Sequence, residues 1–297
     1  MSDPKTPEQE ASGAAVKEEV TTLQDRKVKE PVSMVPPIVK VEDAKDRFRK
    51  SYVSLVTVPS LGYLYDDKFP GGELYMSPMT ASEEKILLSN KRDRAGLVDQ
   101  VVQRCIVEMP IKYEELLLQD FFYLLLSLRN ISYGSTYSCS LDCPACRTTY
   151  NYDIELPAGL RMTVLTEEDE DEPYEVDLPV SGDRLGWRRL RISDEMEIRR
   201  FAKKAYNNSN DVGDPTYCFR IARHLVTLNG TPIDSLEKLE YAENLIASDM
   251  NALRQHMEQL DFGARLAIDT ECPACGREEE TQLPFSREFF RPSNAGR

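Results

Sequence analysis

The sequence predicts an α+β fold in which a helical core carries a β element that a long, mainly helical insertion splits in two. Apolar residues recur at helical spacing over several segments between 80 and 262, which predicts helices. Period-two segments instead flank two copies of Cys-Pro-Ala-Cys, at 143–146 and 272–275. The 125 residues between the copies, 147–271, would form the insertion.

Length and composition indicate a globular chain. Its 297 residues, 41% of them hydrophobic, can bury a core. The longest apolar run, 116–128, is interrupted by Gln119 and Asp120 and is shorter than the roughly 20 residues that a bilayer requires, so we expect a core helix and no membrane span. The first twenty residues lack the features of a secretory signal, which predicts a reducing, cytoplasmic setting.

The charge balance disfavours nucleic acid as a partner. The net charge is −14 and the pI is near 4.8, whereas nucleic-acid binding needs a basic footprint. One basic segment, Trp-Arg-Arg-Leu-Arg at 187–191, is interpreted as an exposed sheet face.

Four regions are predicted along the chain. Each is recognised by a change in composition or in hydrophobic period. They are a disordered N-terminal arm at 1–45, an α+β domain with the first cysteine turn at 46–146, an inserted β-hairpin and helical subdomain at 147–262, and the second cysteine turn with a C-terminal helix at 263–297.

Within the N-terminal domain, alternation and turn residues predict strands in 48–65 and 73–76. Thr80 and Glu83 form a capping box that starts a helix running to about Asn90. Two further helices are expected at 96–107 and 113–129, with 130–134 turning the chain into the first cysteine strand.

Beyond the first cysteine turn, we expect a strand at 148–154 and a hairpin pairing 174–178 with 185–192. The acidic run 167–172 predicts a solvated loop. Three or four helices fit 193–262. The last elements expected are strands at 263–270 and 280–283 and a short helix capped by Ser286.

Cys143, Cys146, Cys272 and Cys275 are the candidate metal ligands. Two sulfurs of a Cys-x-x-Cys turn chelate one ion, and two such turns complete a tetrahedral Zn²⁺ shell. Hairpins that face each other across the ion have the geometry of a zinc ribbon, here split by the insertion. A structural zinc contributes on the order of 10 kcal/mol, enough to offset the closure of a long loop. We therefore predict a structural zinc clasp that holds the C-terminal half against the N-terminal half.

Other residues leave alternatives open. Cys139 is a fifth candidate ligand, and the two cysteine pairs can also act separately or stay idle. Cys105 and Cys218 fall on apolar helical stripes and are interpreted as core residues. The only histidines, His224 and His256, are assigned to ordinary helix positions, which disfavours catalytic zinc.

No nucleotide-binding or hydrolase motif occurs, and no catalytic residues or small-molecule substrate are predicted. The sequence therefore favours a protein that is not an enzyme.

The segment 58–137 resembles the baseplate hub and hub-assembly proteins of contractile-tailed, T-even-like phages. The resemblance rests on VPSLGYLY, GELYMSPMTASEEKILLSN, VDQVVQRCIV and LLLQDFFYLLLSLRNISYGSTYS. The matching residues are Pro59, Ser60, Gly62, Met79, Thr80, Glu83, Asp120, Arg129, Ser132, Tyr133 and Gly134.

The resemblance implies a structural component or assembly factor that contacts other phage tail proteins. It would be made late and act in the host cytoplasm during assembly; retention in the virion tail is left open. For Asp120 and Arg129 the resemblance implies a buried salt bridge on the core helix in preference to a functional role, although the two residues, nine apart, can also be unrelated. The alternative is a zinc-ribbon transcription regulator that binds a polymerase or nucleic acid.

Overall fold

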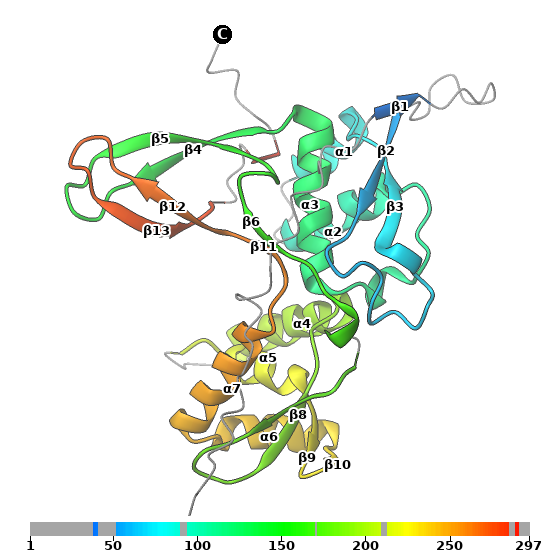
Figure 1. Cartoon of the computed structure of the whole chain (residues 1–297), viewed down its shortest axis with the longest axis vertical. Helices are drawn as coiled ribbons and strands as arrows, with labels where there is room; N and C mark the ends of the chain where they lie inside the picture. Colours follow the sequence, from blue (N-terminus) through cyan, green and yellow to red (C-terminus); the bar gives the residue numbers. More distant parts are fainter. Residues whose placement is uncertain are drawn as a thin grey trace, which may run out of the picture.

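The computed structural model describes residues 38–40, 52–89, 94–169, 171–208, 213–284 and 289–290, and they form a mixed α+β fold. Figure 1 shows three parts: a body around α3, an arm of two hairpins, and a second body at the opposite end. The predicted disordered segment 1–45 lies outside the described residues except for Ile38–Lys40, which form strand β1. The helix predicted at Ser286 also begins outside them.

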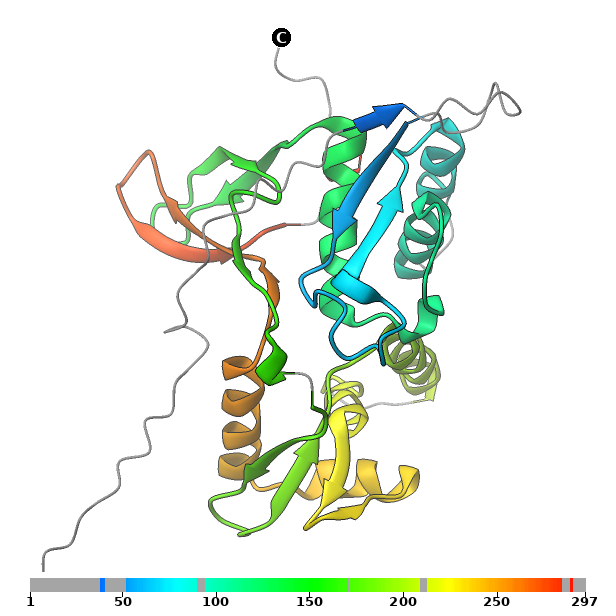
Figure 2. The same ribbon diagram turned by 45° about the vertical axis from the view of Figure 1, so that its right-hand side comes forward.

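The first body packs one sheet and the two helices α1 and α2 around α3, as the view in Figure 2 also shows. Its sheet has the antiparallel order β1-β2-β3. The elements are β1 (Ile38–Lys40), β2 (Tyr52–Thr57), β3 (Glu73–Met76, after the 3-10 turn Pro70–Gly72), α1 (Ala81–Leu87), α2 (Arg94–Cys105), the 3-10 turn Tyr113–Glu115 and α3 (Leu118–Tyr133).

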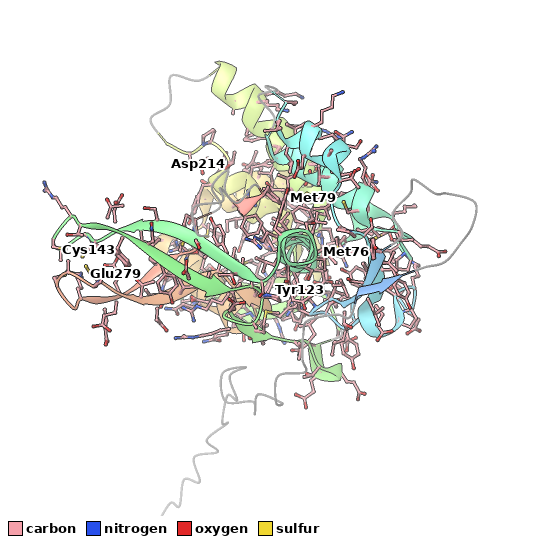
Figure 3. All side chains as sticks on the ribbon, turned by 90° about the horizontal axis from the view of Figure 1, so that it is seen from above. Met76, Met79, Tyr123, Cys143, Asp214 and Glu279 are labelled. Carbon is pink, nitrogen blue, oxygen red and sulfur yellow. The ribbon has the colours of Figure 1, made fainter. Side chains whose placement is uncertain are left out.

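Helix α3 is the centre of the first hydrophobic core, which surrounds it on most sides. Of the residues from Asp120 to Asn130, all except Phe122 are buried, which makes ten buried residues. Figure 3 looks down this helix, with Met76 of β3 close beside it and Tyr123 among its own side chains. None of the helices in the described part of the chain has the length and apolarity that crossing a bilayer requires.

The predicted capping box is confirmed: the Thr80 side chain accepts a hydrogen bond from the Ser82 N–H, and Glu83 accepts one from the Thr80 N–H. The boundaries predicted for α3 are wrong. The helix begins at Leu118 instead of 113 and continues through 130–133, because Gly134 with φ of 89° is the residue that ends it.

The salt bridge implied between Asp120 and Arg129 does not form. Nine residues put the two side chains on opposite faces of α3 and about 13 Å apart along its axis. Asp120 instead accepts hydrogen bonds from the Ser60 N–H at 3.0 Å and the Tyr65 hydroxyl at 2.6 Å. Arg129 donates to the carbonyl oxygens of Gly134 and Thr136, just past the helix end.

Asp120 thereby fixes the loop that joins β2 to β3. Burial raises the pKa of this carboxyl to about 6, although the hydrogen bonds from Ser60 and Tyr65 act to lower it. Tyr65 extends the contact, since its hydroxyl accepts from the Leu117 N–H at the start of α3. The loop is therefore held against the first turn of α3.

Gly62 is the residue on which the close packing of this loop depends. Its φ is +87°, and an added Cβ would lie 1.8 Å from the Phe69 carbonyl oxygen. We expect Gly62→Ala to lower the free energy of unfolding by about 3 kcal/mol, from both the positive φ and the clash. Gly182, with φ of +74° and open space around it, is the control: alanine there should cost about 1 kcal/mol. If urea denaturation gave the same loss of unfolding free energy for both variants, the clash at Gly62 would be contradicted.

The arm consists of two antiparallel hairpins that project away from the first body (Figures 1 and 3). One pairs β4 (Thr136–Asp142) with β5 (Thr149–Glu155), and the other pairs β12 (Ala267–Glu271) with β13 (Glu278–Gln282). A short ladder at their base pairs β6 (Arg161–Thr163) with β11 (Gly263–Arg265). Segments 100 or more residues apart in the sequence thus lie side by side at the base of the arm.

The second body has its own sheet, of order β10-β9-β8-β7, and its own hydrophobic core. The 3-10 turn Glu167–Asp169 precedes it. Its elements are β7 (Tyr174–Asp177), β8 (Arg184–Trp187), α4 (Ile192–Asn208), α5 (Tyr217–His224), β9 (Leu225–Leu228), β10 (Thr231–Pro232), α6 (Ser235–Asn244) and α7 (Ala247–Gln259). The β7–β8 hairpin and the helices were predicted, whereas the β9–β10 hairpin was not.

The only tryptophan of the chain, Trp187, lies in this second core, and its ring contacts the rings of both histidines. The Trp187 indole N–H donates to His256 Nδ1 at 3.0 Å. His224 Nδ1 lies 2.8 Å from the Arg188 carbonyl oxygen, which accepts its hydrogen bond. Both histidines therefore support the packing of Trp187, and neither is an ordinary helix position.

Acid should unfold the second core first. Burial lowers the pKa of His224 to about 4, so the folded state favours the neutral ring. Its contribution to stability is full above pH 6.5 and is lost as the pH falls from 6.5 towards 4, by up to about 3 kcal/mol. Trp187 fluorescence in urea, measured at pH 7.5 and 4.5, reports the loss.

The matched variant is His224→Asn, whose side-chain amide can still donate to the Arg188 carbonyl but does not titrate. We expect a smaller pH effect in this variant than in the unmodified chain. An unchanged pH dependence would show that carboxylates alone cause the acid sensitivity.

Candidate metal centre

The two cysteine turns lie at the outer tips of the two hairpins. Cys143 directly follows β4, and Cys272 directly follows β12, so each hairpin ladder determines where its turn is. Alternate residues of β4 are buried, among them Tyr137, Cys139 and Leu141, which face inwards. Figure 3 shows Cys143 at the far end of the arm, where the two tips meet.

Both turns have the same backbone conformation. In the first, the Arg147 N–H donates to the Cys143 carbonyl at 2.8 Å, and in the second the Gly276 N–H donates to the Cys272 carbonyl at 2.8 Å. The residue after each second cysteine is left-handed, with φ of 61° at Arg147 and 68° at Gly276. Arg147 thus adopts the conformation that glycine favours, so the sequence difference between the turns does not change their shape.

The four turn cysteines form one cluster. The Sγ atoms of Cys143, Cys146, Cys272 and Cys275 all lie within 4.8 Å of one another. Two cross-turn distances, Cys143 to Cys275 and Cys146 to Cys272, are 3.7 Å. Four sulfurs about 2.3 Å from a tetrahedral metal ion would be about 3.8 Å apart. A disulfide would need about 2.05 Å, and all four cysteines are free.

The surroundings of the cluster favour a thiolate at Cys146 but not at Cys275: the backbone hydrogen bond of Arg277 acts to lower the pKa of the Cys275 thiol, but its contacts with Cys146 and Cys272 raise it to about 12. Cys143 and Cys272 are buried, while Cys146 and Cys275 are exposed. The side-chain and backbone hydrogen bonds of Thr148 lower the pKa of the Cys146 thiol to about 6. A soft, four-sulfur donor set of this shape fits Zn²⁺ or another thiophilic ion.

The remaining cysteines lie apart from the cluster. Cys139, the fifth candidate, points into the first hydrophobic core. Cys105 is fully buried in the same core, as predicted. Cys218 is half-buried against the second core. The structure therefore brings together the four cysteines of the two turns and leaves Cys139 outside.

The arm is also closed by contacts that involve no cysteine. The Tyr150 hydroxyl donates to Thr270 Oγ1 at 3.2 Å, and Arg161 forms an ion pair with Asp269. At the base, the Tyr137 hydroxyl donates to the Pro284 carbonyl. Together with the β6–β11 ladder, these contacts already bring the two ends of the insertion together.

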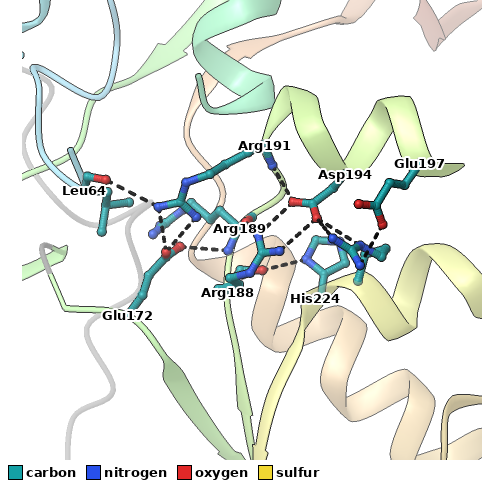
Figure 4. Close-up of polar contacts among 9 residues, drawn as sticks. Leu64, Glu172, Arg188, Arg189, Arg191, Asp194, Glu197 and His224 are labelled. Carbon is teal, nitrogen blue, oxygen red and sulfur yellow. Dashed lines mark hydrogen bonds and ion pairs between the residues drawn. The ribbon is translucent and has the colours of Figure 1, made fainter. Parts of the chain in front are cut away.

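A second polar constellation, which the sequence did not predict, lies where the two bodies meet; Figure 4 shows it. We call it the arginine junction, and it comprises Glu172, Arg188, Arg189, Arg191, Asp194 and Arg223. Asp194 is fully buried at its centre. Arg188 donates to both of its carboxylate oxygens at 2.7 and 2.8 Å, and Arg223 donates to Oδ1 at 2.6 and 3.0 Å.

The electrostatics of the junction favour a charged Asp194. Burial acts to raise the pKa of its carboxyl, but hydrogen bonds from Arg188, Arg191 and Arg223 outweigh burial and lower it. Arg189 is almost fully buried, with its guanidinium 4.4 Å from the Tyr174 ring centroid and 5.1 Å from that of Phe262. The prediction that these arginines form an exposed sheet face is therefore wrong.

The acidic run also differs from the solvated loop that was predicted. Asp169 is buried and accepts hydrogen bonds from the Thr166 N–H and hydroxyl. Glu172 accepts from the Arg189 N–H at 2.8 Å and pairs with Arg191. Arg191 in turn reaches the Leu64 carbonyl of the first body. Part of the run is thus structural, because it neutralises the arginine junction.

Backbone pairing completes the connection between the bodies. The Leu118 N–H donates to the Leu190 carbonyl, and the Ile192 N–H donates to the Leu116 carbonyl. Leu117 and Arg191 form an isolated antiparallel bridge. The segment that enters α3 is therefore tied to the segment that enters α4.

Comparison with known proteins gave one family. Residues 62–291 match the family described as T4 bacteriophage base plate protein. No curated protein and no solved structure gave a significant match. The matched range includes α3, both cysteine turns and the arginine junction. The match covers more than half of the 297 residues of the chain, and the chain therefore belongs to the T4 bacteriophage base plate protein family.

Proposed function

We propose that the chain is a structural component or assembly factor of the baseplate hub and acts through protein–protein contacts, without catalysis. Membership of the base plate family supports a place in the phage tail. Its partners are other base plate and tail proteins. Assembly takes place in the host cytoplasm, and the chain is retained in the virion tail.

The turn cysteines are the ligands of one structural Zn²⁺ in this proposal. The observation that supports it is the cross-turn Sγ separation of 3.7 Å, which is close to the distance between two sulfur ligands of a tetrahedral zinc–thiolate site. Four sulfur ligands leave no open position for a substrate, which suits a structural role. The two hairpins are then a zinc-ribbon-like element whose halves are separated by the inserted second body.

The proposed domains follow the regions expected from the sequence: 46–146, the insertion 147–262, and 263–297, which returns to the first. Two separate hydrophobic clusters support this division. The first contains residues from both sides of the insertion, such as Tyr137 and Ile268, and the second is built within it, from residues between Tyr174 and Leu260. The flanks of the insertion belong to the first cluster, through Ile154, Leu156, Leu160, Leu165, Ile192 and Phe262.

Two measurements test the proposal. Cross-linking of purified particles, followed by mass spectrometry, should join this chain to proteins of the central tail axis. Cross-links only to peripheral base plate proteins would contradict the assignment to the hub but would agree with membership of the base plate family. Metal analysis of the purified chain should give about one zinc per chain. Salt-dependent binding of nucleic acid, with no association with particles, would instead favour a zinc-ribbon regulator.

A further inference from the structure

We propose that the four cysteines of the arm are also an oxidation site, at which a peroxide replaces the metal by two disulfides that join one hairpin tip to the other. The products would be Cys143–Cys275 and Cys146–Cys272. The proposal deepens the metal centre and rests on it only for the metal-loaded starting state.

The pairing follows from distance. The sulfur contacts at 3.7 Å both run between tips, from Cys143 to Cys275 and from Cys146 to Cys272. Disulfide formation needs each pair to approach to about 2.05 Å, which calls for small side-chain movements. The backbone hydrogen bonds that close each turn can remain in place during this change.

In each proposed disulfide pair, one cysteine is exposed to solvent and the other is buried, so the two can have different roles. Cys146 and Cys275 are exposed, so a peroxide in solvent can reach their sulfurs. Their respective partners, Cys272 and Cys143, are buried. Each pair therefore combines a thiol that solvent oxidants reach with a neighbouring thiol that they do not, an arrangement suited to an oxidised and a resolving cysteine.

The chemistry proceeds in two steps at each pair. The exposed thiolate attacks one peroxide oxygen, the O–O bond breaks, and the sulfur becomes a sulfenic acid as hydroxide leaves and is protonated. The buried thiolate then attacks that sulfur, the S–O bond breaks, and a second water forms with the S–S bond. Two sulfurs lose two electrons in total to one peroxide. Two peroxides thus consume all four thiolates, and the ion, having lost its ligands, is released.

The consequence is a connection that survives loss of the metal. The Cys143–Cys275 bond would close a loop across the whole insertion, so the tips stay joined under conditions that remove zinc. Reduced chain treated with a chelator would lose this connection, whereas oxidised chain would keep it. The arm is thus suited to a particle that leaves a reducing cytoplasm for an oxidising medium.

The test uses the full chain, loaded with zinc and treated with hydrogen peroxide in steps. Metal release is followed with a chromogenic chelator, and the product is digested with trypsin without reductant. The peptides 130–147 and 266–277 carry the first and second turns. We expect them to appear as one covalently linked species that reductant separates, together with the loss of four free thiols per chain.

Paired variants identify the bonds. Cys143→Ser with Cys275→Ser leaves Cys146 and Cys272, which lie 3.7 Å apart. The control, Cys143→Ser with Cys272→Ser, leaves the two exposed cysteines. We expect the first metal-free variant to form its disulfide faster. An equal or slower rate would overturn the assigned pairing, and the experiment on the unmodified chain does not depend on these variants folding.

Two outcomes overturn the proposal: separate peptides that each carry an internal disulfide, and oxidation that ends in sulfinic acids without cross-links. The fate of the metal centre is read independently. Zinc binding followed by disulfides within each turn would retain the metal centre and refute the oxidation site. Cross-linking between the tips in a chain that binds no metal would support the oxidation site and refute the metal centre.

Discussion

Replacing Cys272 and Cys275 together by serine is expected to abolish metal binding and loosen the arm while both hydrophobic cores stay folded. Half of the sulfur ligands are lost, and a thiol pair alone does not complete a tetrahedral shell. Structural zinc stabilises small domains by on the order of 10 kcal/mol. In this chain the loss should fall on the tips of β4–β5 and β12–β13, which depend on the cluster most directly.

The expected limit to the damage comes from the contacts at the base of the arm. The β6–β11 ladder and the hydrogen bond from Tyr137 to the Pro284 carbonyl do not involve the metal. The clasp predicted from the sequence holds the C-terminal half against the N-terminal half, so on that prediction alone loss of zinc would loosen the whole C-terminal half. With the base contacts in place, we expect the free energy of unfolding of the second core, reported by Trp187 fluorescence, to change by less than about 0.5 kcal/mol.

Hydrogen exchange measures the effect where it is expected. Amides of β12 and β13 should exchange at least about a hundredfold faster in the double variant, which corresponds to about 3 kcal/mol of local stability. Cys218→Ser is the control, since Cys218 packs against the second core and lies outside the cluster. Unchanged exchange in β12 and β13, or full metal content in the double variant, would contradict the metal centre.

The features that the sequence predicted well are those with local causes. The Thr80 capping box, β3 and the shape of both cysteine turns depend on residues within a few positions of one another. The joining of the two turns could also be predicted, because tetrahedral coordination by thiolates needs sulfurs from both. The general α+β class followed from the change between period two and helical spacing.

The misassigned features depend on partners that are distant in sequence. The segment 187–191 alternates like an exposed strand, yet Arg188 binds Asp194 and Arg189 lies between aromatic rings. The residues after Trp187 leave the sheet, so their alternation no longer describes a solvent face. The β9–β10 hairpin was missed because Leu225–Leu228 directly follow α5, and the apolar pattern continues across the junction.

Asp194→Ala is expected to cause the largest loss of stability among single substitutions in the junction. It removes the carboxylate that Arg188 and Arg223 both contact, together with the acceptor of the Arg191 N–H at 2.9 Å. Two half-buried guanidinium groups would then face each other without the anion between them. Removing one partner of a buried ion pair costs about 3–5 kcal/mol, because the remaining charge is left uncompensated.

Two further variants separate charge from shape. Asp194→Asn keeps the volume and one acceptor oxygen but loses the negative charge, so its cost should lie between those of alanine and the unmodified residue. Asp177→Ala is the surface control: Asp177 is 84% exposed and its distance to Arg184 is 4.0 Å, so its loss should change stability by less than about 0.5 kcal/mol. Urea denaturation followed by Trp187 fluorescence compares all three.

Hydrogen exchange of Asp194→Ala, measured beside the urea denaturation, distinguishes two roles for the arginine junction. If it mainly supports the second body, Asp194→Ala should shift the Trp187 transition and leave hydrogen exchange in α3 unchanged. If it joins the bodies, the amides of Leu118 and Ile192, which donate to the carbonyls of Leu190 and Leu116, should lose protection as well. We expect the second result, because Arg191 contacts both Glu172 and the Leu64 carbonyl of the first body. A loss below about 1 kcal/mol would show that the junction contributes little to folding.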